Sequence, residues 1–426
     1  MKHIKIKISK KYFFEDTTLL LITLQVLLFR FLNIQSYFNK VIVFFVAVSV
    51  LKSVHKKRFR PYPYGVLIFC VISSLLVTLN GLILGFHVPY INNILMLFYP
   101  LIDALYLLHY CRLYPQKLIN ILLKTHKFIN CYFILNIIVL FIQMSGIPFL
   151  VGIHDWENPA YYDLISGLFG YSTTHVLCMF SVFFVIYELA YIRLKDGKNK
   201  LKKYIYVIII TLLTFYISFV NDNTAYYLVL ILFLAWYILF SNKQNTLSKA
   251  RRNLFILLII LAFVISTILL QPKFVNEITN WVNYKIVGSF SNMEISPSNI
   301  TNGSMERIAQ IYYGINYADG LKLGVGLSRS GLFNNVTFGF KHFGLASAGA
   351  VICLGGIWLY FSLICLYAEI ASSIIEVYSG RKKMISRRIC YIITWLILSI
   401  YTTIFTDVSV TVSTFFIVLA FCLLEI

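Results

Sequence analysis

Residues 63–86 read PYGVLIFCVISSLLVTLNGLILGF, a run that contains no charged residue. A single α-helix needs about 20 mainly apolar residues to cross the hydrocarbon core of a bilayer. The run is long enough for one crossing, and its few polar side chains are uncharged. This stretch therefore predicts a membrane-spanning helix, and it sets the fold class of the chain.

Runs of the same kind recur along nearly the whole sequence. The chain has 426 residues, of which 59% are hydrophobic and 13% charged, and its mean hydropathy is +0.79. Soluble domains are about 45–50% apolar and about 25% charged. We expect an all-α, polytopic integral membrane protein of about 12 transmembrane helices. Besides 63–86, the expected spans are 17–35, 38–54, 90–110, 128–150, 164–192, 204–220, 223–240, 253–271, 344–375, 389–405 and 408–424.

The net charge of +20 comes from basic residues that cluster in alternate gaps between the apolar runs. The clusters at 1–11, 51–60, 111–127, 193–203, 241–252 and 380–388 hold 29 of the 37 lysines and arginines. This alternation is the positive-inside pattern of cytoplasmic loops. Nucleic-acid binding would need basic residues on one face of a folded domain, and the sequence leaves no room for such a domain.

These clusters fix the expected topology. With both termini in the cytoplasm, an even number of spans places every basic cluster on the cytoplasmic side. The outer side then receives short turns, including those near 36–38 and Asp407, and one large external loop. We therefore divide the chain into a nine-helix membrane region at 1–271, the loop at 272–343, and a three-helix membrane region at 344–426.

The loop contains the polar stretch GSMERIAQIYYGINYADGLKLGVGLSRSG at 303–331. Arg307 and Arg329 are candidates to bind an anion, because arginine can hold phosphate with two parallel hydrogen bonds. Gly324 and Gly326 would let backbone N–H groups approach that anion. A lipid-linked pyrophosphate at the outer leaflet is an anion within reach. The alternative is that these arginines contact lipid headgroups or acidic neighbours.

Other candidate residues lie at predicted outer turns and span ends. His342, next to Lys341, could act as an acid, a base or a phosphate contact. His154 and Asp155, in the turn at 151–163, suit sugar hydroxyls, or they are simply part of a negative outer loop. Arg30, near the outer end of the first span, could meet a phosphate or extend to the interface.

Several kinds of chemistry find no sequence support. The eight cysteines form no CxxC pair, so neither a disulfide framework nor a zinc site is indicated. Walker, HExxH and GxSxG motifs are also missing from the sequence, which argues against nucleotide-driven transport and against hydrolysis on a soluble fold. We expect no metal and no cofactor.

The order of these elements resembles the Wzy-type O-antigen and polysaccharide polymerases, which are related to the O-antigen ligases. The shared features are twelve spans, one long outer loop between the ninth and tenth span, and a degenerate motif pattern. The residues that carry the pattern are Gly303, Ser304 and Arg307, then Gly324 and Gly326, then Lys341 and His342 before Gly355 and Gly356.

The resemblance implies a metal-independent glycosyltransferase with a GT-C-like fold in the bacterial cytoplasmic (inner) membrane. Such an enzyme takes an undecaprenyl-pyrophosphate-linked glycan as donor and another as acceptor, among membrane lipids, and works with a chain-length regulator and a flippase. It implies that Arg307 binds the pyrophosphate and that Arg329 or Lys341 is a second clamp. His342 or Glu306 would be the catalytic base.

One feature departs from the family pattern. Many members carry a Ser-Arg pair at an outer helix start in the middle of the chain, whereas this sequence has NDNTAYYLVL at 221–230. Arg30 is the candidate to replace that missing phosphate contact.

Two alternatives remain at the level of sequence. A ligase would need the same pyrophosphate clamp and sugar groove as a polymerase. A flippase or transporter would favour charged or broken helices at the midplane, and Asp103 beside Pro100 is compatible with it. No repeat symmetry supports the transporter, and its function does not require a large outer loop.

Overall fold

The computed structural model describes most of the predicted membrane regions and a small part of the long loop. The described residues are 12–55, 64–84, 89–151, 164–170, 173–194, 200–221, 223–240, 311, 314–315, 320–324, 326, 346–379 and 384–425. The expected span at 253–271 and most of the loop at 272–343 lie outside them.

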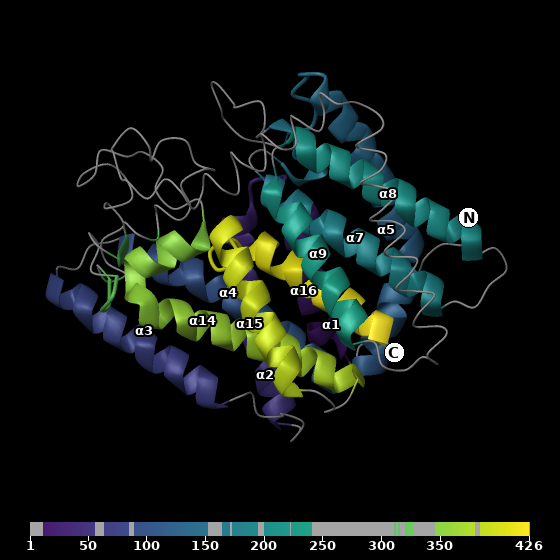
Figure 1. Cartoon of the computed structure of the whole chain (residues 1–426). Helices are drawn as coiled ribbons and strands as arrows, with labels where there is room; N and C mark the ends of the chain where they lie inside the picture. Colours follow the sequence, from purple (N-terminus) through teal and green to yellow (C-terminus); the bar gives the residue numbers. More distant parts are fainter. Residues whose placement is uncertain are drawn as a thin grey trace.

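The described part of the chain is built from α-helices and turns, without a β-strand (Figure 1). Seven of its helices are long and apolar enough to cross a membrane, namely α2, α3, α4, α5, α7, α8 and α14. The fold is therefore the all-α fold of a membrane-spanning protein. The helices are α1 (Phe13–Leu24), α2 (Gln35–His55), α3 (Tyr64–Leu84), α4 (Pro89–Leu113), α5 (Pro115–Met144), α7 (Thr174–Leu194), α8 (Lys200–Val220), α9 (Thr224–Phe240), α14 (Ser347–Ser379), α15 (Met384–Tyr401) and α16 (Val408–Glu425).

Helices α7, α14 and α16 form the centre of the molecule. Helix α16 packs against α7, α14 and α4, and the described side chains of all these central helices are buried over most of their length. Small hydroxyl side chains let helices approach closely inside a membrane protein. In α16, Thr411 and Thr414 donate hydrogen bonds back to the carbonyls of Asp407 and Val410, so their buried hydroxyl groups are satisfied within the helix.

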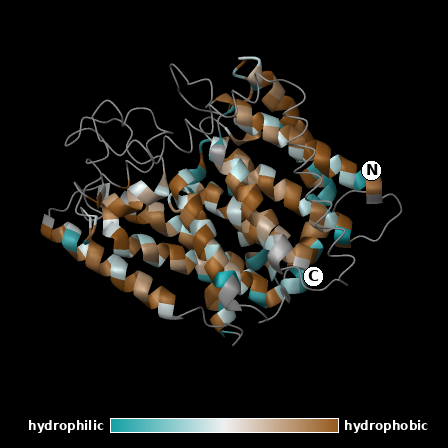
Figure 2. Ribbon diagram, viewed as in Figure 1, coloured by the Kyte–Doolittle hydropathy of each residue, from teal (hydrophilic) through white to brown (hydrophobic). Residues whose placement is uncertain are grey.

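The outer helices expose apolar side chains instead of polar ones. Helix α3 lies along α14 at the edge of the molecule, and α8 lies beside α7 (Figure 1). Figure 2 shows hydrophobic residues over most of both outer helices. A face this apolar is covered by lipid in a membrane protein, because water would not solvate it. The exposed side chains include Ile68, Leu75, Leu79 and Ile83 on α3 and Ile205, Ile209, Leu212 and Tyr216 on α8.

Ion pairs connect α1 and the turn that follows it to other parts of the molecule, at both ends of the helix. At its start, Glu15 pairs with Lys52 at the end of α2 with a 3.0 Å N–O distance, and Asp16 pairs with Lys117 at the start of α5. Just beyond its other end, Arg30 pairs with Asp407. The basic clusters at 51–60 and 111–127 thus both contact the start of α1. The turns on either side of Arg30 and Asp407, which the sequence assigns to the other side of the membrane, meet beyond its end.

Three helices differ from the sequence expectation, either in where they begin or in being kinked. Helix α5 begins at Pro115, well before the expected start at residue 128, because proline fits the first turn of a helix. The span expected at 164–192 is interrupted, since Gly170 takes a φ of 94° and α7 begins only at Thr174. Helix α14 is kinked at Gly356, where φ is 72°.

Candidate functional site

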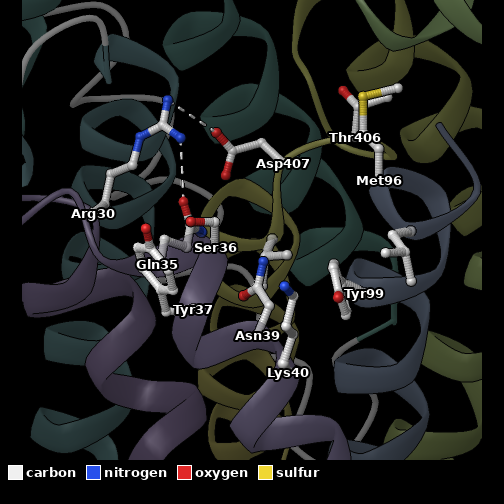
Figure 3. Close-up of a pocket in the computed structure, with 12 residues that line it drawn as sticks. Arg30, Gln35, Ser36, Tyr37, Asn39, Lys40, Met96, Tyr99, Thr406 and Asp407 are labelled. Carbon is white, nitrogen blue, oxygen red and sulfur yellow. Dashed lines mark hydrogen bonds and ion pairs between the residues drawn. The ribbon is translucent and has the colours of Figure 1, made fainter. Parts of the chain in front are cut away.

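A cavity of about 400 Å³ opens where the turn before α2 meets the turn before α16, with α4 as its third wall. Figure 3 shows Arg30 and Asp407 facing each other, with Lys40 of α2 and Tyr99 of α4 farther along the same space. The cavity mixes charged, amide, hydroxyl and aromatic side chains. Its lining is Arg30, Gln35, Ser36, Tyr37, Asn39, Lys40, Leu95, Met96, Tyr99, Thr406, Asp407 and Val408.

Arg30 is positioned by the turn that joins α1 to α2. A π-helical turn at Gln25–Phe29 continues α1, and Asn33 then takes a φ of 55°, which reverses the chain into α2. Arg30 Nη1 donates to Gln35 Oε1 at 3.2 Å, and Gln35 Nε2 donates to Ser409 Oγ at 2.9 Å. Gln35 therefore fixes the guanidinium of Arg30 relative to the first turn of α16.

Asp407 is positioned by the start of α16. Its Oδ1 accepts a 2.8 Å hydrogen bond from the backbone N–H of Ser409, which is the usual arrangement of a helix N-cap. Its Oδ2 lies 3.8 Å from Nη2 of Arg30, at the long end of the range for an ion pair. The side chains of Arg30 and Asp407 are 33% and 16% exposed. A partly exposed pair at so long a distance contributes about 0–1 kcal/mol, so Asp407 leaves Arg30 able to bind another anion.

Arg30 also retains an unused donor. Its Nε is buried and has no hydrogen-bond partner among the described residues. A buried donor without a partner is costly, and each such group in a folded protein calls for an explanation.

Lys40 is the second cation of the cavity. It is exposed on α2, and no acidic residue in the described part of the chain forms an ion pair with it. The cavity therefore combines two cations, Arg30 and Lys40, with one carboxylate. The N-termini of α2 and α16 also border it, and a helix N-terminus favours negative charge. The net electrostatics favour an anion.

Lys40 was missed by the sequence reasoning, although a signal existed. Of the 37 basic residues, 29 lie in the six basic clusters and six at 272–343, which leaves only Arg30 and Lys40. Both of these residues line the same cavity.

Most of the candidate residues from the sequence lie outside the described residues. This applies to His342, Glu306, Arg307, Arg329, Lys341, His154 and Asp155. Of the candidates, the structure describes Arg30, which lines the cavity, and Gly324 and Gly326, which do not. Whether the loop residues approach Arg30 therefore stays a prediction.

Gly324 and Gly326 pack tightly against two membrane helices. Both take positive φ angles, 64° and 70°, which favour glycine. A Cβ at Gly324 would lie 2.5 Å from the carbonyl oxygen of Cys353 in α14, and one at Gly326 would lie 2.3 Å from Cα of Gly81 in α3. Packing alone thus requires glycine at both positions, and their proposed contact with an anion remains a separate prediction.

The same loop segment fills the kink in α14. A Cβ at Gly324 would lie 2.8 Å from the backbone nitrogen of Gly356, and a Cβ at Gly356 would lie 2.2 Å from the carbonyl oxygen of Lys322. The backbone N–H of Ile357 donates to the carbonyl of Gly320 at 2.7 Å, and Asn80 Nδ2 donates to the carbonyl of Gly324 at 3.0 Å. The end of the long loop is therefore held between α3 and α14.

The described residues contain no group of three or more His, Cys, Asp or Glu side chains arranged to hold a metal ion. The polar groups of the cavity are instead those that contact phosphate and sugar directly: guanidinium, ammonium, amide, hydroxyl and phenol. Its chemistry is therefore that of an anion site with hydroxyl-binding neighbours.

Comparison of the chain with protein-family models, with curated proteins and with solved structures finds no match. The functional interpretation accordingly depends on the composition, on the motif pattern of the loop and on the chemistry of the cavity.

Proposed function

We propose that this protein is a membrane glycosyltransferase that polymerises undecaprenyl-pyrophosphate-linked oligosaccharide repeat units into a surface polysaccharide. It works at the outer face of a bacterial cytoplasmic membrane, with both termini in the cytoplasm and the long loop outside. The positive-inside distribution of the basic clusters supports this orientation.

The observation that carries the proposal is the cavity with Arg30 and Lys40. The orientation above places it near the outer surface, where a lipid-linked pyrophosphate would lie. Two cations and two helix N-termini suit the diphosphate. The amides of Gln35 and Asn39 and the phenol of Tyr37 suit sugar hydroxyls and ring faces.

The reaction is a displacement at the anomeric carbon of the donor glycan. A hydroxyl oxygen of the acceptor sugar forms the new glycosidic bond as the bond from the anomeric carbon to the phosphate oxygen breaks. Undecaprenyl pyrophosphate leaves with that electron pair, and a base takes the hydroxyl proton. Arg30 and Lys40 offset the charge that develops on the leaving group, which is the kind of electrostatic stabilisation that contributes most to catalysis.

The residues of the long loop complete this assignment. Arg307 contacts the pyrophosphate, with Arg329 or Lys341 as a second clamp, and His342 or Glu306 is the base. These roles follow from the motif pattern, which resembles that of Wzy-type polymerases. His154 and Asp155, in the turn at 151–163, contact the sugar, because the acidic and aromatic side chains of that turn suit sugar hydroxyls and ring faces.

The test is to delete the gene and complement it with wild-type protein, Arg30→Gln or Arg388→Gln. A polymerase deletion leaves a single repeat unit on the surface, a ligase deletion leaves undecorated lipid core, and a flippase deletion accumulates repeat units in the cytoplasm. We expect the first result, and we expect Arg30→Gln to fail to restore long chains.

Arg388 is a matched control for Arg30. It is also an arginine in an ion pair, with Nε 2.7 Å from Glu369 Oε2, and it does not line the cavity. Arg388→Gln should restore normal chains. Normal chain length with Arg30→Gln, at wild-type protein level, would contradict the proposal.

A flippase is the second candidate, and one observation favours it. Asp103 is buried in α4, and its Oδ2 has no hydrogen-bond partner among the described residues. Ionisable groups buried in membrane helices are costly and mark transport pathways in many proteins. Pro100 lies inside the same helix.

A further inference from the structure

A second hollow continues directly from the cation-lined cavity. It has a volume of about 390 Å³ and lies between α2 and α4. The two hollows share Lys40, Leu95 and Tyr99. Apart from Lys40 and the phenol of Tyr99, the side chains that line the second hollow are hydrocarbon. An apolar groove therefore begins where the polar cavity ends.

The groove follows the helices toward the middle of the molecule. On α4 its lining extends from Ile94 to Ile102, which is about 12 Å along the axis at 1.5 Å per residue. On α2 it continues from Lys40 to Val43. Both helices begin at the end of the molecule that holds the cavity, so the groove leads from that surface into the depth of the bilayer.

The arrangement matches a molecule with an anionic head and a long apolar chain. Lys40 sits at the junction of the two hollows, and no acidic residue of the described chain neutralises it. A cation on a membrane helix is costly unless it meets an anion or reaches water. A diphosphate in the cavity, with its chain in the groove, would satisfy Lys40 and Arg30 together.

An ordinary bilayer phospholipid is the competing occupant, because any apolar groove on a membrane helix is filled by some lipid chain. Two features favour a diphosphate lipid over it. The cavity offers two cations instead of one, and the N-termini of α2 and α16 border it. A single phosphodiester carries less charge and fewer acceptors for these groups.

We propose that the groove between α2 and α4 binds the polyprenyl chain of a lipid diphosphate whose headgroup occupies the adjoining cavity. The lipid enters sideways from the bilayer. Ile94, Phe98 and Val43 contact the chain, and Lys40 contacts the phosphate nearest to it. This inference rests on the proposed function, because it identifies where the lipid carrier of that reaction is held.

The experiment measures binding to the purified full-length protein in detergent with three probes: undecaprenyl diphosphate, inorganic pyrophosphate and phosphatidylglycerol. Ile94→Trp and Val43→Trp fill the groove from either side, and Lys40→Gln removes the cation. Ile72→Trp, at an exposed apolar position of α3 away from both hollows, is the control. Thermal unfolding of each variant establishes that it is folded.

We expect both groove variants to weaken undecaprenyl diphosphate binding by about tenfold or more, as the loss of a few buried methylene groups would. Their affinity for inorganic pyrophosphate should stay at the wild-type value. Lys40→Gln should weaken the binding of both ligands, and Ile72→Trp should weaken the binding of neither. Phosphatidylglycerol should compete poorly.

Two results would overturn the inference. Wild-type affinity for undecaprenyl diphosphate in both folded groove variants would show that the chain lies elsewhere. Equal competition by phosphatidylglycerol would show that the groove holds ordinary lipid. If the lipid diphosphate binds as expected but gene deletion leaves surface glycans unchanged, the proposed function fails while the lipid site stands.

Discussion

Arg30 and Asp407 face each other at 3.8 Å between Nη2 and Oδ2, and they join the turn before α2 to the turn before α16. The distance is long for an ion pair and both side chains keep some contact with solvent, so Asp407 does not neutralise Arg30 fully. Asp407 therefore holds the guanidinium in place in the absence of ligand and competes with an incoming anion.

Asp407→Asn should tighten the binding of inorganic pyrophosphate by up to about fivefold, which corresponds to the loss of about 1 kcal/mol of competing ion pair. Asparagine caps a helix about as well as aspartate, so α16 should remain intact. Calorimetric titration measures the affinity. Glu369→Gln removes the carboxylate partner of Arg388 away from the cavity and should change nothing. Weaker binding in Asp407→Asn would show that Asp407 orients Arg30 rather than competing for it.

Arg307→Ala should leave the protein inserted in the membrane and abolish long glycan chains, because Arg307 is the predicted pyrophosphate contact of the loop. Arg307→Lys should restore part of the activity, since lysine keeps the charge but loses the bidentate fork. Gel analysis of surface polysaccharide, with protein level measured in the same membranes, reports the result. Normal chain lengths in Arg307→Ala would count heavily against the clamp.

The helices were predictable because a sufficiently long apolar run is a property of the sequence alone. The topology stays a prediction, which depends on the placement of the basic clusters in alternate gaps. The cavity was not predictable from the sequence, because it depends on contacts between distant segments. Asp407 was recognised as part of an outer turn, but its pairing with Arg30 joins the two ends of the chain. Lys40 could have been singled out from the sequence, because only Arg30 and Lys40 lie outside the basic clusters and the loop, but its place beside Arg30 could not.

The glycines show the same limit in another way. Gly324 and Gly326 were singled out for their backbone freedom, and both do adopt positive φ angles. Their tight contacts with Cys353 and Gly81 are tertiary, so no local pattern could reveal them. The sequence indicated that glycine is required at both positions. It suggested a bound anion as the reason, whereas close packing against α14 and α3 is a second reason that only the structure shows.

Gly356→Ala should lower the stability of the protein by about 3 kcal/mol. A φ of 72° with a ψ of 176° is a backbone conformation that costs an alanine about 1–3 kcal/mol, and overlap with the carbonyl of Lys322 adds to this. Gly146→Ala has the strained φ without the overlap and should cost about 1 kcal/mol. Gly65→Ala has neither, and it should stabilise the protein by up to about 1 kcal/mol, because alanine favours a helix more than glycine does. Thermal unfolding in detergent measures the order. Equal effects at Gly356 and Gly146 would show that the loop segment does not press on the kink.

Gln143→Leu should destabilise the connection between α5 and α7 by about 3 kcal/mol. The buried amide donates to the carbonyls of Phe149 and Gly167 and accepts from the backbone N–H of Ser166 and Gly167. Leucine leaves these backbone groups without partners, and each unsatisfied group costs about 1–3 kcal/mol. Gln116→Leu, an exposed position on the same helix, is the control and should stay within about 0.5 kcal/mol. A stability loss shared by both variants would assign the effect to leucine itself.

Asp103→Asn separates the polymerase from the flippase. The carboxyl group is buried, and its Oδ2 lacks a partner in the described structure. A polymerase has no step that needs this acid, so the variant should make normal glycan chains. Replacing a buried unpaired acid with a neutral isostere should also leave the unfolding temperature unchanged or higher, because the cost of burying a charge is removed. Labelling of repeat units on the outer surface of intact cells provides the second measurement. Loss of lipid-linked units from that surface, with the protein still folded, would favour a flippase and would make Asp103, not Arg30, the centre of its function.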